Sequence, residues 1–239
     1  CIFPFEYDVY KEAGAKVEFV GHPLVDIVKP SMTINEANAF AGKKEGRKLI
    51  LLMPGSRLME IEKMLPTLLE AAKIIQKQLP EVDFVMPRAG TIPLNLLEEK
   101  IQASGLDVRI TEGHNYDLFS VADLALATSG TVTLEAALCG LGSVIVYRTN
   151  PLTYMIAKLV VNIPHIGLPN IVAGRSVVPE LIQNDFTPAK VAKAAMELLE
   201  SERNALMKKD LEYVKERLGK PGAVGRVAEL VLKIAGEKR

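Results

Sequence analysis

The sequence contains no tryptophan, only two cysteines and three histidines, and no long uninterrupted apolar run. Cys1 and Cys139 are far apart and form no CxxC motif, so a disulfide framework is not expected. Every apolar run is shorter than the ~20 residues that a membrane-spanning helix needs. The first residues also lack the basic region of a signal peptide. These absences predict a protein of the reducing cytoplasm.

An excess of charge of either sign is missing as well. The 239 residues include 29 basic and 29 acidic side chains, so no overall field attracts nucleic acid, and we expect no nucleic-acid partner. The three histidines are widely separated and no acidic pair is spaced with them, which predicts that there is no metal site. Apolar residues make up 49% of the chain, which is typical of an ordinary globular protein of one large or two small domains.

Short apolar runs alternate with helical patterns from residue 48 onward. The runs predict strands at residues 49–53, 83–86, 107–110, 124–127, 143–147 and 166–171. Apolar residues at steps of three and four predict helices at 59–78, 93–103, 116–121, 131–138 and 152–161. This order predicts right-handed βαβ units, and therefore a Rossmann-like parallel sheet with helices on both faces.

Both ends of the chain differ from this pattern. Three helical patterns without intervening strands follow at 188–200, 204–218 and 224–234. At the start, a short helix after Phe3 and an apolar stretch at 17–20 resemble a piece of a βαβ unit, and residues 29–46 read as a linker with one helical turn at 37–41. Because the sequence opens on Cys1 in what reads as the end of a strand, we expect a fragment. The apolar stretch 152–161 favours core packing over contact with acyl chains or a membrane.

Two of the predicted strands end in turns that carry hydroxyl, glycine and charged residues. Pro-Gly-Ser-Arg follows Met53, and Thr-Ser-Gly-Thr follows Ala127. Ligands of open parallel sheets bind at the carboxyl ends of the strands, where loops meet helix N-termini. Backbone N–H groups, hydroxyls and an arginine at such turns suit a phosphate.

A carboxylate follows the second turn within the same predicted helix. Glu135 lies four residues after Thr131, one helical turn further on the same face. A carboxylate there can accept two hydrogen bonds from the cis-diol of a ribose. Phosphate at the helix start and sugar one turn away is the geometry of a nucleotide diphosphate. Plain helix capping by Ser129, with a solvated Glu135, is an equally good interpretation of this turn alone.

Six motifs in order resemble the lipid-A-disaccharide synthase family. Along the chain they are the stretch at 21–24, the turn after Met53 with Glu60, the turn after Ala127 with Glu135, and the stretches at 144–148, 168–171 and 178–183. The opening residues 3–6 also resemble the family. The resemblance covers essentially the whole chain, and mainly the C-terminal half of the family. It implies the GT-B architecture, in which two Rossmann-like halves hold the substrates between them.

The resemblance also implies a reaction. Diacylglucosamine would pass from UDP-2,3-diacylglucosamine to 2,3-diacylglucosamine 1-phosphate, giving the β-1,6 lipid A disaccharide 1-phosphate and UDP. The enzyme would be inverting and independent of metal or other cofactors. It would work as a peripheral protein on the cytoplasmic face of the inner membrane, where the full-length enzyme would contact the membrane surface. A homodimer is one option for its assembly.

Site roles carry over residue by residue. Gly55, Ser56, Arg57 and Glu60 would face the donor diphosphate or sugar, with Arg57 stabilising the leaving UDP. Ser129, Gly130 and Thr131 would hold phosphate, Glu135 the ribose, and Asn170 uridine or sugar. The resemblance places the general base in the N-terminal half, so none is named here, and we expect this chain to bind UDP without turnover.

The family pattern implies a division of the chain. Residues 1–28 would be the end of the N-terminal domain and the crossover, 29–46 a linker, and 47–220 the C-terminal UDP-sugar-binding domain. Residues 221–239 would form a terminal helix, and in one option this helix runs back to the N-terminal half. Two alternatives stay open: another UDP-sugar enzyme of this architecture (an epimerase or a transferase), or a noncatalytic nucleotide-binding module.

Overall fold

A six-stranded parallel sheet forms the centre of the protein. The computed structural model describes residues 1–150, 154 and 164–237. The strands are β1 Lys48–Met53, β2 Val82–Arg88, β3 Val108–Glu112, β4 Leu124–Thr128, β5 Ser143–Tyr147 and β6 Glu180–Ile182. Their order in the sheet is β3-β2-β1-β4-β5-β6, and every pair is parallel. The fold class predicted from the alternating pattern is confirmed.

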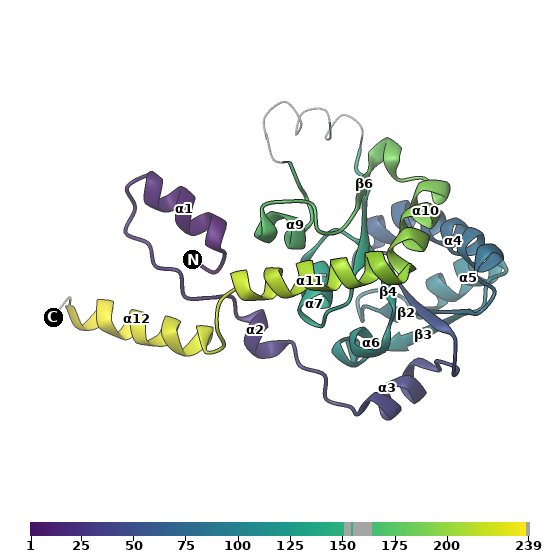
Figure 1. Ribbon diagram of the computed structural model, residues 1–239, viewed down its shortest axis with the longest axis horizontal. Coiled ribbons are helices and arrows are strands. Elements are labelled where there is room, and N and C mark those ends of the chain that lie inside the picture. Colours follow the sequence, from purple (N-terminus) through teal and green to yellow (C-terminus); the bar gives the residue numbers. More distant parts are fainter. Residues whose placement is uncertain (151–153, 155–163, 238–239) are drawn as a thin grey trace.

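Helices cover both faces of this sheet (Figure 1). The helices before and within the sheet are α1 Pro4–Glu12, α2 Leu24–Ile27, α3 Ile34–Ala41, α4 Leu58–Gln78, α5 Leu94–Ser104, α6 Asn115–Val121 and α7 Thr131–Leu138. Those that follow are α9 Leu168–Ala173, α10 Pro188–Leu199, α11 Ser201–Arg217 and α12 Ala223–Glu237. No helix in the described ranges is both long and apolar enough to cross a membrane.

Strand β1 shows how the sequence produces two apolar layers. Ile50 and Leu52 pack in one core cluster with α4, α5 and α10, whereas Leu49 and Leu51 pack in a second cluster with α3 and α6. Successive side chains of a strand point to opposite faces, so a continuous apolar run is buried on both. A third cluster, from α7, α9 and α11, covers the sheet around β5.

One predicted strand is wrong. Residues 166–171 were expected to extend, but Leu168–Ala173 form helix α9. Pro169 occupies the first turn of this helix, where its missing N–H costs nothing, and Gly174 ends it at φ 69°. The sixth strand is instead β6, whose three residues are only half-buried and give no strong apolar signal.

The two ends of the described chain contact each other. The 17–20 stretch belongs to none of the six strands, contrary to the βαβ-like interpretation. Instead the His22 N–H donates to the Leu218 carbonyl at 2.9 Å, and the Asp26 carboxylate accepts the N–H groups of Gly222 and Ala223. α1 and α12 lie at the left of Figure 1, away from the strands. The predicted helix at 152–161, for which core packing was favoured over contact with acyl chains or a membrane, lies almost entirely outside the described residues.

A buried carboxylate attaches the predicted linker to the sheet domain. Asp117 is 2% exposed and accepts the N–H groups of Ser31 and Met32 at 2.6 and 2.7 Å, and the Ser31 hydroxyl at 3.0 Å. Burial by itself raises the pKa of Asp117, but these hydrogen bonds more than offset it, so the pKa lies below its ordinary value. The charged form is therefore the one that stabilises this fold.

Replacing Asp117 with Asn should destabilise the protein by about 2–3 kcal/mol at neutral pH, because the amide leaves buried donors without a full set of acceptors. A carboxyl whose pKa is lowered by folding stabilises the folded protein at pH values above its ordinary pKa of 3.8. That stabilisation is lost as the pH falls through the lowered pKa. Urea denaturation between pH 7 and 3 should therefore show a shallower acid loss for D117N than for the unaltered chain. The exposed Asp107 supplies the control, and D107N should keep the full acid dependence.

Candidate functional site

The turn between β1 and α4 is held by a carboxylate of its own. Glu60 Oε2 accepts the N–H groups of Ser56 at 2.8 Å and Arg57 at 3.2 Å, and Glu60 Oε1 lies 3.2 Å from Arg57 Nη1. From the sequence, the backbone N–H groups of this turn were expected to bind an anion. In the structure, those of Ser56 and Arg57 are hydrogen-bonded to Glu60. This is a standard capping arrangement, which fixes the entry into α4 and orients the start of the Arg57 side chain.

Gly55 is required by this arrangement. Its φ of 122° lies in the region that side chains rarely adopt, and a Cβ would stand 2.3 Å from Glu60 Oε2 and 2.6 Å from Glu60 Cβ. The turn is further anchored by the Thr91 hydroxyl, which donates to the Ser56 carbonyl at 2.7 Å. The Arg57 side chain is 81% exposed, so its guanidinium is free to reach a ligand beside the turn.

The second turn presents unpaired backbone donors. Helix α7 begins at Thr131 with Gly130 as its N-cap and has no side-chain cap. The first N–H groups of a helix have no partner within it, and those of Thr131 and Val132 have none among the described residues, so they are available at this end. A Cβ at Gly130 would meet nothing within 4 Å, and φ is 167°, so neither packing nor backbone conformation demands glycine there.

Ser129 contributes differently from expectation. Its hydroxyl donates at 2.9 Å to the Ile166 carbonyl, so its one hydrogen is already used within the protein. Thr131 is exposed, and its hydroxyl has no partner in the described structure. Thr131 thus remains available as a donor, whereas Ser129 positions the turn.

Glu135 is half-buried one turn along α7, and no hydrogen-bond or ion-pair partner for its carboxylate is found among the described residues. Burial raises the pKa of Glu135 above its ordinary value. An unpaired carboxylate in such a place is costly for the fold. Its oxygens are therefore free to accept hydrogen bonds from a ligand.

Both turns line one cavity of about 400 Å³. Of the predicted site residues, the cavity collects Gly55, Ser56, Arg57, Glu60, Ser129, Gly130, Thr131 and Glu135. It lies at the carboxyl ends of β1 and β4, which are neighbours in the sheet with Met53 opposite Ala127. The eight residues therefore lie together at the edge of the sheet where the sequence predicts them.

Three polar lining residues were not selected from the sequence: Arg88, Asn115 and Thr128. Arg88 ends β2, donates to the Ile92 carbonyl at 2.6 Å and pairs with Glu112. The signal that would have found it is the same strand-end rule, applied to β2 as well as to β1 and β4.

Asn170 does not line this cavity. It is 0% exposed, its amide nitrogen donates to the Val178 carbonyl and Glu180, and its oxygen accepts the N–H groups of Val177 and Val178. The whole hydrogen-bonding capacity of this side chain is used inside the protein. Asn170 therefore joins α9 to the loop before β6, and the expected contact with uridine or sugar is not available in this conformation.

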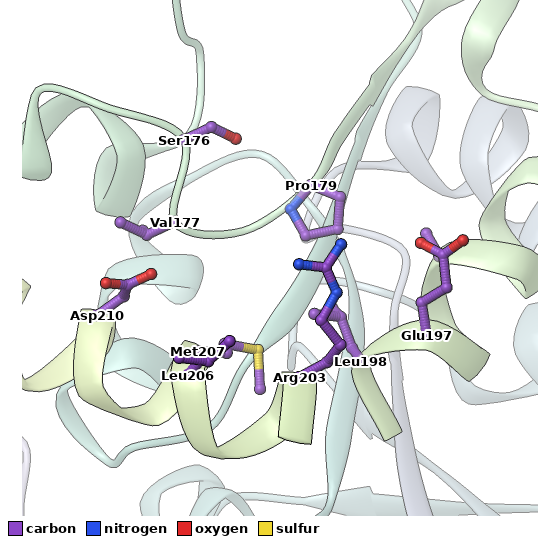
Figure 2. Close-up of a pocket in the computed structure, with 10 residues that line it drawn as sticks. Ser176, Val177, Pro179, Glu197, Leu198, Arg203, Leu206, Met207 and Asp210 are labelled. Atoms are coloured by element: carbon purple, nitrogen blue, oxygen red, sulfur yellow. The ribbon is translucent and has the colours of Figure 1, made fainter. Parts of the chain in front are cut away.

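A second cavity of about 260 Å³ lies between α10, α11 and the loop before β6. Figure 2 shows the Arg203 side chain rising from α11 toward Pro179, with Glu197 on α10 to one side. This cavity contains none of the predicted site residues. Its arginine and glutamate are nevertheless useful as matched controls for those of the first cavity.

Fold and cavity together define a Rossmann-like α/β domain with a polar cavity at the carboxyl ends of its strands. The profile of the lipid-A-disaccharide synthetase family matches residues 1–234, and the chain belongs to this family. It is 42% identical over 238 residues to the lipid-A-disaccharide synthase of Geobacter sulfurreducens, covering 99% of this chain and 62% of the relative. It is 43% identical to the synthase of Trichlorobacter lovleyi, covering 97% and 61%. The chain thus spans about three fifths of the length of these relatives.

A solved structure shares the fold at low sequence identity. The UDP-GlcNAc 2-epimerase from Neisseria meningitidis, bound to UDP-GlcNAc, superposes with a TM-score of 0.61 at 18% identity. The match covers 95% of this chain and 58% of the epimerase. At this identity the likeness establishes the fold alone.

Replacing Gly55 with Ala should destabilise the protein by about 2–4 kcal/mol, because it combines backbone strain with a collision against Glu60. Gly130→Ala is the matched control: its backbone is extended and the added methyl meets open space, so it should lose less than about 1 kcal/mol. Urea denaturation measures both variants. Equal losses would show that the Gly55–Glu60 contact does not constrain the turn.

Proposed function

We propose that this chain binds the donor nucleotide of a lipid-A-disaccharide synthase. The reaction is transfer of diacylglucosamine from UDP-2,3-diacylglucosamine to 2,3-diacylglucosamine 1-phosphate, with formation of a β-1,6 bond and release of UDP. The observation that carries the proposal is the cavity in which the uncapped start of α7 and the unpaired Glu135 lie on one side and Arg57 on the other. These groups match the phosphate, the ribose and the leaving group of one nucleotide.

The diphosphate would lie at the start of α7. The unpaired N–H groups of Thr131 and Val132, the positive end of the helix and the Thr131 hydroxyl all favour phosphate oxygens there. The ribose would lie one turn further, where Glu135 is free to accept both hydroxyls of the diol. Binding would thereby supply the hydrogen bonds that this carboxylate lacks in the unliganded protein.

Arg57 would act on the departing UDP. Its guanidinium is permanently charged and exposed at the cavity, and its contact with Glu60 at 3.2 Å is weak enough to be exchanged for a phosphate. Negative charge develops on the leaving diphosphate during transfer, and a fixed cation there lowers the barrier. We propose that this arginine and α7 provide the stabilisation without a metal or other cofactor.

Other parts of the reaction would come from the remainder of the full-length protein. The acceptor hydroxyl needs a base, which we propose lies in the portion of the relatives that this chain does not span. We also propose that the full-length enzyme contacts the membrane surface and is located peripherally on the cytoplasmic face of the inner membrane. A homodimer is the assembly to be tested.

An epimerase is the second candidate, because the Neisseria meningitidis epimerase that shares the fold binds UDP-GlcNAc. The two functions differ in the sugar nucleotide that the enzyme binds most tightly. If the synthase proposal is correct, the full-length protein should bind the diacylated sugar nucleotide far more tightly than plain UDP-GlcNAc. An epimerase would bind plain UDP-GlcNAc at least as tightly and would interconvert it without an acceptor.

Calorimetric titration with UDP tests the proposal. The unaltered chain should bind one UDP, and R57A and E135Q should each weaken binding by roughly 10- to 100-fold, since each loses a charge-assisted contact worth about 1.5–3 kcal/mol. R203A and E197Q, in the second cavity, carry the same chemical changes and should bind UDP normally. No binding by the folded, unaltered chain would refute the proposal.

The UDP affinity should also depend on pH through Glu135. Only the carboxylate accepts both ribose hydrogen bonds, and burial raises its pKa, so affinity should fall as pH decreases through that raised value. E135Q cannot titrate and should lack this component. Because a terminal phosphate also titrates near pH ~6, the meaningful quantity is the difference between the two pH profiles. Parallel profiles for E135Q and the unaltered chain would contradict the assignment.

A further inference from the structure

Two buried hydroxyls in the described structure have no hydrogen-bond partner. They are those of Thr111 on β3 and Thr128 at the end of β4. A buried hydroxyl without a partner destabilises a fold, so each requires an explanation. Only Thr128 lines the cavity proposed to hold the nucleotide.

Strand geometry directs Thr128 toward the first turn. Leu124 and Leu126 pack in the cluster on the α4 side of the sheet, whereas Ala125 and Ala127 pack on the other side. By alternation, Thr128 points to the α4 side, where the turn at Gly55 and Ser56 forms the opposite wall of the cavity. The side chain is 3% exposed. It therefore stands at the floor of the cavity, between the two turns.

The surroundings of this hydroxyl select an anionic ligand oxygen. The donors at the start of α7 follow it by three residues in the chain, and the neighbouring Ser129 hydroxyl is already committed to Ile166. The nearest carboxylate of the first turn, Glu60, is engaged by the N–H groups of Ser56 and Arg57. The Thr128 hydroxyl therefore has a free hydrogen and lacks an acceptor among the described residues.

We propose that the Thr128 hydroxyl donates a hydrogen bond to a diphosphate oxygen of the bound nucleotide. This inference rests on the proposed function and adds a residue that determines recognition of the diphosphate. Less than 1 Å² of the oxygen is accessible, so the contact requires Thr128 to turn about χ1 to another staggered position when the ligand enters. The partner that the fold does not provide is then provided by the ligand.

Thr128→Val tests this assignment, because it exchanges the hydroxyl for a methyl group of similar shape. Without ligand, T128V should be as stable as the unaltered chain or melt about 2–4 °C higher, since a buried unpaired group is gone. In calorimetric titrations it should bind UDP and inorganic pyrophosphate about 10- to 100-fold more weakly. T128S, which restores the hydroxyl, should recover most of both affinities.

Thr111→Val is the matched control. It removes the other unpaired hydroxyl, so it should gain similar stability and leave both affinities unchanged. Normal UDP and pyrophosphate binding by T128V would overturn this inference and leave the proposed function intact. If T111V weakened binding equally, the effect would be general, and the inference would also fail. A folded, unaltered chain that binds neither probe would overturn the proposed function, and this inference with it.

Discussion

The parallel pairing of β1 with β4 brings together two turns that are more than 70 residues apart in the chain. With Met53 opposite Ala127, the Gly55 turn and the Gly130 turn leave the same edge of the sheet side by side. Because β1 and β4 are buried on both faces, a shift of their register by one residue would move every side chain into the opposite core cluster and disrupt the packing of both. The geometry of the cavity is therefore set by core packing, and its polar residues need not hold the two turns together.

Within this frame, the carboxylates have opposite roles. Glu60 is satisfied by the backbone of its own turn and preserves the conformation that Gly55 makes possible. Among the described residues, neither the Glu135 carboxylate nor the Thr128 hydroxyl has a hydrogen-bond partner. Satisfied polar groups shape the walls, whereas unsatisfied ones mark where a ligand can compensate an existing cost.

The chain represents about three fifths of the length of the synthases that it resembles. In the proposed function, the cavity of this part binds the donor nucleotide, and the acceptor is activated elsewhere in the full-length protein. Under that proposal, the affinity for UDP would be a property of the sheet edge at β1 and β4. Turnover would further depend on how the rest of the protein presents the acceptor and its base.

The sequence by itself determined the parallel sheet and its first five strands, because a continuous apolar run is a local property. It also indicated the two turns that line the first cavity, because the polar residues that follow each strand are visible directly in the sequence. It failed at 166–171, where the apolar pattern of a short helix and that of a buried strand are the same. Only the tertiary structure decided how polar groups are paired. It directed Asn170 inward to the loop before β6 and closed Glu60 on its own turn, because hydrogen-bond partners are chosen by proximity in the folded chain. It also left Glu135 and Thr128 without partners in the part of the chain that the structure describes.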